Sequence, residues 1–356
     1  MTPHAATWTS PFAAHDEKDR SHLLTNRDVV MIGRQGLQAP PSEDSYGPSR
    51  IRSQVRSDGA HVLDIHIFFS VIRLLTREEE ATVQSRTEAV GSVVLLWRYP
   101  VKSMIGEELN ASEVTERGLL GDRAYALLDP TTGKVVSAKN PRKWRRMFEF
   151  RAAFVDPPQL DRPLPPVRIT CPEGTTTASD GGDVEPLLSK NLDRSVRLMV
   201  SAPETPSLEE YWPDIEGLAH REKVTDELMP SRTFFDLAVL HVLTTTTLDR
   251  LRQLYPEGRF DVRRFRPNIV VEPTSGAGGF PEDGWIGKTL NIGHQVRIRV
   301  TGPCPRCVMT TLPQGDLPRD PGILRTAAKH HQVNVGVYAS VVRGGMIRRG
   351  DPVAVE

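Results

Sequence analysis

The chain has 356 residues, of which 38% are hydrophobic, and its 45 basic residues balance its 45 acidic ones. This length suits two compact domains and an irregular tail better than a single core. The balanced charge excludes an overall attraction to nucleic acid or to an anionic membrane, so a bound anion must be small and held by a local group of basic side chains.

Three cysteines are present, Cys171, Cys304 and Cys307. They are too few for the disulfide framework of a secreted domain, and an iron–sulfur cluster held by cysteine alone would need four thiolates. Residues 1–20 have neither a basic segment followed by an apolar run nor the composition of a transit peptide. We therefore expect a reduced, cytoplasmic protein that receives electrons, if it uses them, from a separate partner.

Residues 1–90 are expected to form a largely disordered extension, because proline, serine and charged residues interrupt any periodicity. The exception is an apolar stretch at 61–75, which is too short to span a membrane and carries Asp64, His66 and Arg73. A short amphipathic helix or strand is expected there. A wrongly assigned start codon is a second explanation for the extension.

From residue 91 onward, short β-like runs alternate with turn signals, which predicts a β-rich domain over 91–225. A proline-rich stretch at 201–214 marks the approach to the boundary. The second domain, 226–356, begins with an apolar segment and continues with helical spacing at Leu248, Leu251 and Leu254. It then returns to strands near 266–273, 290–303 and 334–342. The predicted fold class is mainly β with some α, an α+β fold.

Cys304 and Cys307 form a Cys-x-x-Cys pair directly after an alternating strand. A zinc site would also need His330 and His331, adjacent residues whose side chains are expected to diverge in a strand. A thioredoxin-like dithiol would need a helix start, whereas β-branched residues and a proline follow Cys307. On spacing alone, two structural thiols in a turn and a soft metal centre with one cysteine ligand both remain open.

Residues 93–356 resemble the MOSC proteins that carry an N-terminal β-barrel domain, which include the mitochondrial amidoxime-reducing components and bacterial reductases of N-hydroxylated bases. The resemblance depends on separated blocks in a fixed order: YPVKS at 99–103, GDR at 121–123, FRPNIV at 265–270, WIG and LNIG within 285–293, CPRCVMTT at 304–311, VGVYA at 335–339 and GDPV at 350–353. It implies two β-barrel-like domains, with the MOSC fold at the C-terminus. It also implies a molybdenum–molybdopterin cofactor whose metal is bound by Cys307, the catalytic residue, with Cys304 as a neighbour.

The resemblance also implies contacts to the cofactor from basic, hydroxyl and amide side chains on both domains. They are Lys102, Ser103, Arg123, Thr244, Thr245, Thr247, Arg266, Asn268, Arg306 and Tyr338. Lysine, hydroxyl and guanidinium groups suit a phosphate, and Arg266 is expected to be extended because a proline follows it. The alternatives are a salt bridge from Arg123 to Asp122 or Asp129, a simple helix N-cap at the threonines, and a core position for Tyr338.

As to activity, the resemblance implies a molybdenum-dependent oxidoreductase that reduces N-hydroxylated or N-oxide compounds by oxygen-atom transfer. Its expected electron donor is a separate protein of the ferredoxin or cytochrome b5 type, because no ferredoxin-like domain follows GDPV. The segment LPQGDLPRDPGILRT, after CVMTT, departs from the VDP of the family's reductases and leaves the substrate open. The alternative functions are a sulfur carrier with a persulfide on Cys307, a carrier of the molybdenum cofactor, and a non-catalytic interaction module.

Overall fold

The computed structural model describes residues 89–274 and 276–356. The extension predicted over 1–90 and the amphipathic element predicted at 61–75 lie outside the described residues, except that Ala89 and Val90 already belong to the first strand. Within the described part of the chain, no helix has the length and apolar character needed to cross a membrane.

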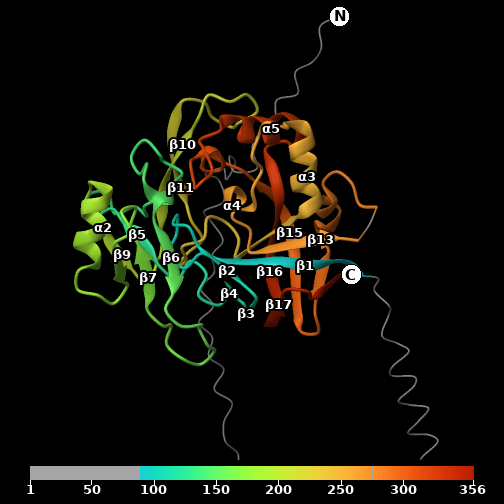
Figure 1. The fold of residues 1–356 in the computed structure, drawn as a ribbon, viewed down its shortest axis with the longest axis horizontal. Coiled ribbons are helices and arrows are strands. Elements are labelled where there is room, and N and C mark those ends of the chain that lie inside the picture. The colour runs from blue at the N-terminus through green and yellow to red at the C-terminus, as the bar shows by residue number, and fades with distance from the viewer. Residues whose placement is uncertain (1–88, 275) are drawn as a thin grey trace, which may run out of the picture. The chain divides into compact units, whose positions relative to one another are not determined.

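Seven strands close into a β-barrel (Figure 1). In order around the barrel they are β13 (Ile269–Pro273), β12 (Leu240–Thr244), β16 (Asn334–Arg343), β15 (Val296–Pro305), β14 (Thr289–Ile292), β18 (Pro352–Val355) and β1 (Ala89–Arg98). The ring closes because β1 pairs with β18 on one side and with β13 on the other, while β2 (Glu107–Leu109) extends the sheet from β1. In β15 the residues Val296, Ile298 and Val300 are buried and alternate with arginine and threonine, as a strand with one face in the core requires.

The remaining strands form smaller sheets. They are β3 (Ala111–Thr115), β4 (Gly118–Leu119) and β17 (Gly345–Arg348); β6 (Arg151–Phe154), β7 (Val167–Thr170) and β8 (Thr176–Ala178); β5 (Ala126–Leu128) with β9 (Arg197–Met199); and β10 (Ser207–Trp212) with β11 (Lys223–Leu228). Single bridges link some of them, since Val135 pairs with both Leu128 and Leu208.

The helices are few and lie between strands. They are α2 (Val184–Leu192), α3 (Thr245–Leu254), α4 (Val262–Phe265) and α5 (Pro321–His331), with the 3₁₀ helices η1 (Met147–Glu149), η2 (Pro281–Trp285) and η3 (Val308–Thr311). The helix expected from Leu248, Leu251 and Leu254 is confirmed as α3, and the first two of these leucines are buried. The prediction that His330 and His331 lie in a strand is wrong. Both residues lie in the last turn of α5. This helix begins after Asp320, whose carboxylate accepts the Gly322 N–H at 2.8 Å, and ends before the left-handed residue Gln332.

The prediction of a mainly β fold with some α is confirmed, since 17% of the structure is helical and the barrel is closed. The part expected to form the first barrel folds, between β2 and β11, into the smaller sheets just described. The boundary near residue 225 stays a prediction. β1 precedes this boundary in the sequence, yet it is an integral strand of the barrel built by residues after it.

The segment after Cys307 joins the two parts of the molecule. Val308, Met309 and Leu312 pack into the apolar core that surrounds Trp144 and Phe150, not into the core of the barrel. Burial of three large apolar side chains stabilises this placement by several kcal/mol, at about 1.5–3 kcal/mol for each side chain. The cysteine therefore lies where the chain leaves the barrel and enters the neighbouring core.

Candidate cofactor site

A cavity lies beside Cys307 and is lined by residues from both predicted domains. It encloses about 720 Å³ of empty space, part of it open to solvent. Its lining includes every predicted site residue except the three threonines: Lys102, Ser103, Arg123, Arg266, Asn268, Arg306, Cys307 and Tyr338. The fold thus brings together side chains that are more than 230 residues apart along the sequence.

Cys307 stands at the start of η3, with an extended backbone at φ −123°. Its carbonyl oxygen accepts the hydroxyl of Thr310 at 3.0 Å and the N–H of the same residue at 3.2 Å, which holds the turn in place. The side chain is partly buried, and this burial raises the pKa of its thiol to about 11; Glu210 raises the pKa further, while Lys139 and Arg306 oppose the shift. A metal ion that binds this sulfur must displace its proton.

Lys102 and Ser103 follow β1 and are both buried. The Lys102 ammonium donates to the carbonyl of Phe234 at 2.8 Å and forms a short ion pair with Asp236. Burial lowers the pKa of Lys102, and Asp236 offsets part of that effect. Ser103 has a left-handed backbone, and its hydroxyl oxygen accepts the N–H of Ala138 at 3.1 Å. Lys102 therefore ties the segment around Asp236 to the cavity wall.

Two arginines of the cavity lining stack on one buried aromatic ring. The guanidinium of Arg266 lies 4.0 Å from the ring centre of Tyr99, and that of Arg123 lies 4.5 Å from it. Arg123 also pairs with Asp122, which is one of the alternatives considered for it. Arg266 donates to the carbonyl of Met104 at 2.8 Å, and among the described residues no carboxylate forms a salt bridge with it. Its burial lowers the pKa of the guanidinium to about 10.

The prediction that Arg266 is extended is wrong. The residue is left-handed, with φ 53° and ψ 48°, and ends α4. Its N–H donates to the carbonyl of Val262 at 3.1 Å and closes the last helical turn. This capping geometry outweighs the usual preference of a residue that precedes proline.

Asn268 and Asp122 connect the barrel to the wall of the cavity. The Asn268 amide donates to the Asp122 carboxylate at 2.9 Å and accepts the N–H of His241 at 3.1 Å. Asp122 also accepts the N–H of Tyr99 at 2.7 Å. The side chain of Asn268 is therefore held by hydrogen bonds within the chain.

The three threonines do not line the cavity. Thr244 caps α3, since its hydroxyl oxygen accepts the N–H of Thr247 at 3.1 Å, and Thr245 is the first residue of that helix. The hydroxyls of Thr244 and Thr247 donate to the buried carboxylate of Glu282 at 2.6 and 2.7 Å. The expected anion cradle at this helix start is thus filled by a carboxylate of the protein itself.

Glu282→Gln should change how stability depends on pH. Burial raises the pKa of Glu282 above its ordinary value of 4.5, so protonation is easier in the folded protein than in the unfolded chain. This contribution to stability is complete below the unfolded pKa and is lost as the pH rises through the folded one. The neutral glutamine has no such loss. We expect the free energy of unfolding of the variant to rise relative to the wild type as the pH increases above 4.5, the ordinary pKa of the glutamate, measured by urea denaturation. Parallel pH profiles would contradict this expectation.

Sequence reasoning missed two charged residues of the cavity, Lys139 and Asp236. The Lys139 ammonium lies 2.9 Å from a Glu210 oxygen and 3.6 Å from an Asp236 oxygen. Burial acts to lower the pKa of Lys139, but these two carboxylates outweigh it and raise the pKa well above the ordinary value. The signal for Asp236 was visible, since it is an acidic residue within the apolar run FFDLAVL.

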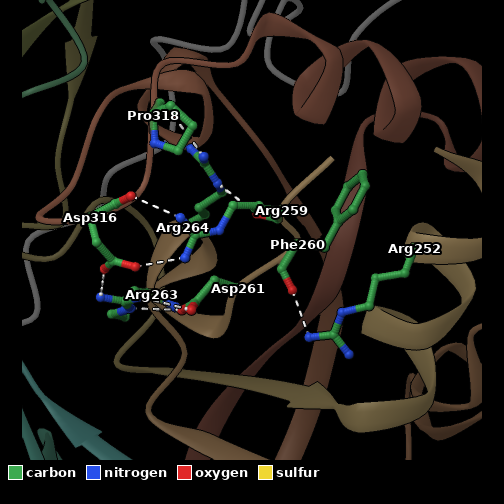
Figure 2. Close-up of polar contacts among 8 residues, drawn as sticks. All are labelled: Arg252, Arg259, Phe260, Asp261, Arg263, Arg264, Asp316 and Pro318. Atoms are coloured by element: carbon green, nitrogen blue, oxygen red, sulfur yellow. Dashed lines mark hydrogen bonds and ion pairs between the residues drawn. The ribbon is translucent and has the colours of Figure 1, made fainter. Parts of the chain in front are cut away.

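Arg264 fixes the segment that follows Cys307. Its side chain is fully buried, and its guanidinium donates to the carbonyls of Arg259 at 2.9 Å, Thr310 at 3.1 Å, Leu312 at 3.2 Å and Pro318 at 2.7 Å. Figure 2 shows this side chain beside the surface pairs that Arg259 and Arg263 form with Asp316. Neither Arg263 nor Arg264 lines the cavity, although both lie within three residues of Arg266 in the sequence.

The side chains that line the cavity suit an anionic ligand. A metal ion there would need most of its ligands from that bound molecule. Five of the lining side chains are lysine or arginine, and Asp236 is the one carboxylate among them. In residues 89–274 and 276–356, no group of three or more histidine, cysteine or acidic residues could hold a metal ion. The described part of the chain thus gives no support to a zinc site made of protein ligands. The cavity instead offers one thiol beside basic side chains.

The described part of the chain is thus a β-barrel protein with a basic cavity next to one thiol. Models of two known families match the chain: the MOSC N-terminal beta barrel domain over residues 90–181 and the MOSC domain over residues 230–354. The chain belongs to the MOSC family, in the arrangement that carries the N-terminal beta barrel domain.

Similar proteins include human mitochondrial amidoxime reducing component 2, which is 26% identical over 299 residues, covering 75% of this chain and 84% of that protein. Human molybdenum cofactor sulfurase is 23% identical over 368 residues, covering 93% of this chain and 39% of its own length. Among solved structures, the YUAD protein from Bacillus subtilis aligns with 74% of this chain and 94% of its own at 11% identity, with a TM-score of 0.36.

Proposed function

We propose that this protein binds the molybdenum cofactor through Cys307 and reduces N-hydroxylated or N-oxide compounds. One observation carries the proposal: the cavity joins a single thiol to five basic side chains without a protein-only metal site in the described residues. A soft thiolate suits a metal whose other ligands are sulfur, and a local group of cations suits a phosphate-bearing pterin. The similarity to an amidoxime reducing component supports the choice of reaction.

Different side chains of the cavity would contact the metal and the anionic part of the cofactor. Cys307 would be the metal ligand. Lys102, Arg123, Arg266 and Arg306 would neutralise and orient the anionic cofactor, while Ser103, Asn268 and Tyr338 hold the wall in shape. When bound, the cofactor supplies two-electron oxygen-atom transfer. The residues of this chain position it, hold its charge and exclude water from the buried part of the cavity.

Reduction of an N-hydroxylated compound consumes two electrons and two protons and releases water. We propose that the electrons come from a separate redox protein of the ferredoxin or cytochrome b5 type. Three cysteines in the whole chain are too few for an iron–sulfur cluster held by cysteine alone. The segment 312–326 lies next to the cysteine and differs from the family pattern, so the substrate is defined here only as an N-oxygenated compound.

A carrier function is the second candidate, because Cys307 is only partly buried and a molybdenum cofactor sulfurase is among the similar proteins. In that case Cys307 would hold a persulfide, or the cavity would bind the cofactor for delivery to another protein. The two candidates share the cavity and differ in whether the bound cofactor turns over.

Metal and pterin analysis tests the proposal directly. Protein purified from a host that makes the cofactor should contain about one molybdenum and one pterin per chain, as a single-site cofactor requires, and should reduce an amidoxime with a reduced viologen dye as electron donor. Molybdenum would be measured by mass spectrometry and pterin by fluorescence after oxidation. Sulfane sulfur without turnover would favour the carrier, and the absence of molybdenum, pterin and sulfane sulfur would leave an interaction module.

A further inference from the structure

Cys304, the first cysteine of the Cys-x-x-Cys pair, has no role in the proposed function. It lies in β15, where the pairing with β16 shifts register between Pro303 and Pro305. Its side chain is completely buried, while the next two residues line the cavity. An irregularity of this kind redirects side chains out of the regular alternation of a strand. The sulfur is therefore buried next to two residues that line the cavity, at an irregular point of the strand.

The Cys304 sulfur is a hydrogen-bond acceptor for Arg306. One terminal nitrogen of the Arg306 guanidinium donates to this sulfur, and the other donates to the carbonyl of Phe265 at 2.8 Å. Two acceptors on two separate N–H edges hold the planar guanidinium in a single orientation. The third nitrogen, Nε, is buried and has no hydrogen-bond partner within the described residues.

Tyr338 lies on the neighbouring strand, β16, and lines the cavity. Its ring contacts His241 edge to face, with 6.2 Å between the ring centres. The strand register places Tyr338 opposite Gly302, two residues before the cysteine. The cavity wall beside the strand that carries Cys304 therefore contains a packed aromatic pair.

Arg306 differs from its neighbour Arg123 in the charge of its partner. Arg123 pairs with the carboxylate of Asp122, which cancels much of its charge. In residues 89–274 and 276–356, Arg306 forms no salt bridge and is oriented by an uncharged carbonyl and a thiol. A neutral acceptor can aim a guanidinium without neutralising it, so the positive charge remains available to a ligand.

We propose that Cys304 is a positioning residue, whose sulfur aims the uncompensated charge of Arg306 at a phosphate or pyrophosphate group bound in the cavity. This inference rests on the proposed function only in requiring an anion there; it needs neither molybdenum nor turnover.

Two substitutions of Cys304 separate positioning from packing. Cys304→Val keeps a small apolar side chain but removes the acceptor, whereas Cys304→Ser keeps an acceptor in a smaller side chain. Isothermal titration calorimetry would measure the binding of inorganic pyrophosphate to the cofactor-free protein. We expect Cys304→Val and Arg306→Gln each to weaken binding about tenfold, as the loss of one charge-assisted hydrogen bond does, and Cys304→Ser to bind within about threefold of the wild type.

A double-variant cycle tests whether Cys304 acts through Arg306. Cys304→Val combined with Arg306→Gln should bind pyrophosphate no more weakly than Arg306→Gln alone. Cys171→Val, which alters a buried thiol in the other core, should leave pyrophosphate binding unchanged and so controls for general effects of losing a thiol.

Several results would overturn the inference. The first two are wild-type affinity for pyrophosphate in Cys304→Val, and weak binding by a folded Cys304→Ser. The third is a double variant whose loss of affinity equals the product of the two single losses. The fourth is a wild-type protein that does not bind pyrophosphate. A protein that shows the expected coupling but acquires no molybdenum would contradict the proposed function while leaving the positioning role intact.

Discussion

Cys307→Ser should abolish molybdenum binding and amidoxime reduction while the protein stays folded. The hydroxyl is a hard, weakly acidic ligand and cannot replace a soft thiolate. Because losing even an outer partner of a metal ligand costs about 10–100-fold, losing the ligand itself should lower turnover by more than about a hundredfold. The measurements are molybdenum content and steady-state turnover, together with a thermal melt to show that the fold persists.

The fold should tolerate this change because the Cys307 side chain is only partly buried and serine has a similar size. The loss of stability should stay within about 1 kcal/mol. The matched control is Cys171→Ala, since Cys171 is buried in the core around Phe150, away from the cavity lining. That variant should lose some stability but keep its molybdenum and its activity. Wild-type turnover in Cys307→Ser would disprove the assignment of the metal ligand.

Arg264→Met should cause the largest loss of stability. The guanidinium donates to four carbonyl oxygens, two of them in fully buried hydrogen bonds, and methionine can donate to none of them. At about 1 kcal/mol for each hydrogen bond lost, the free energy of unfolding should fall by about 4 kcal/mol. For a unit of this size the melting temperature should drop by about 10 °C, measured by calorimetry or circular dichroism.

Arg252→Met is the matched control for Arg264→Met. The Arg252 side chain is 49% exposed and makes one hydrogen bond to the carbonyl of Phe260 (Figure 2). It also forms one ion pair, with Asp249. Its loss should change stability by no more than about 0.5 kcal/mol, as expected for an exposed pair. Equal melting temperatures for the two variants would show that Arg264 does not stabilise the segment after Cys307.

Stability and function are connected through this segment. Arg264 holds the carbonyls of Thr310 and Leu312, and the hydroxyl of Thr310 in turn bonds to the carbonyl of Cys307. A loosened η3 would therefore displace the proposed metal ligand. We expect folded Arg264→Lys, which keeps the charge but loses the planar set of donors, to retain less molybdenum than the wild type.

Much of the architecture was predictable from local patterns. Alternating burial in 296–300 predicts a strand, the leucine spacing in 248–254 predicts a helix, and both are present. The cavity residues near 102, 123, 266, 306 and 338 were grouped by their resemblance to a family, and the structure brings them to one cavity. Neither the closure of the barrel by β1 nor the insertion of 308–312 into the other core has a local signal, since both depend on contacts between distant parts of the chain.

By itself, the sequence determined which segments form strands and helices and which residue types are available for binding, because hydrophobic periodicity and side-chain chemistry are local properties. Only the tertiary structure decided which hydrogen-bond and ion-pair partners each polar group has. Thr244 and Thr247 donate hydrogen bonds to Glu282, and Arg266 is a left-handed cap of α4. Within residues 89–274 and 276–356, Arg306 has no carboxylate partner. The physical reason is that hydrogen bonding and charge compensation depend on which groups are neighbours in space, and those neighbours come from strands and loops far apart in the sequence.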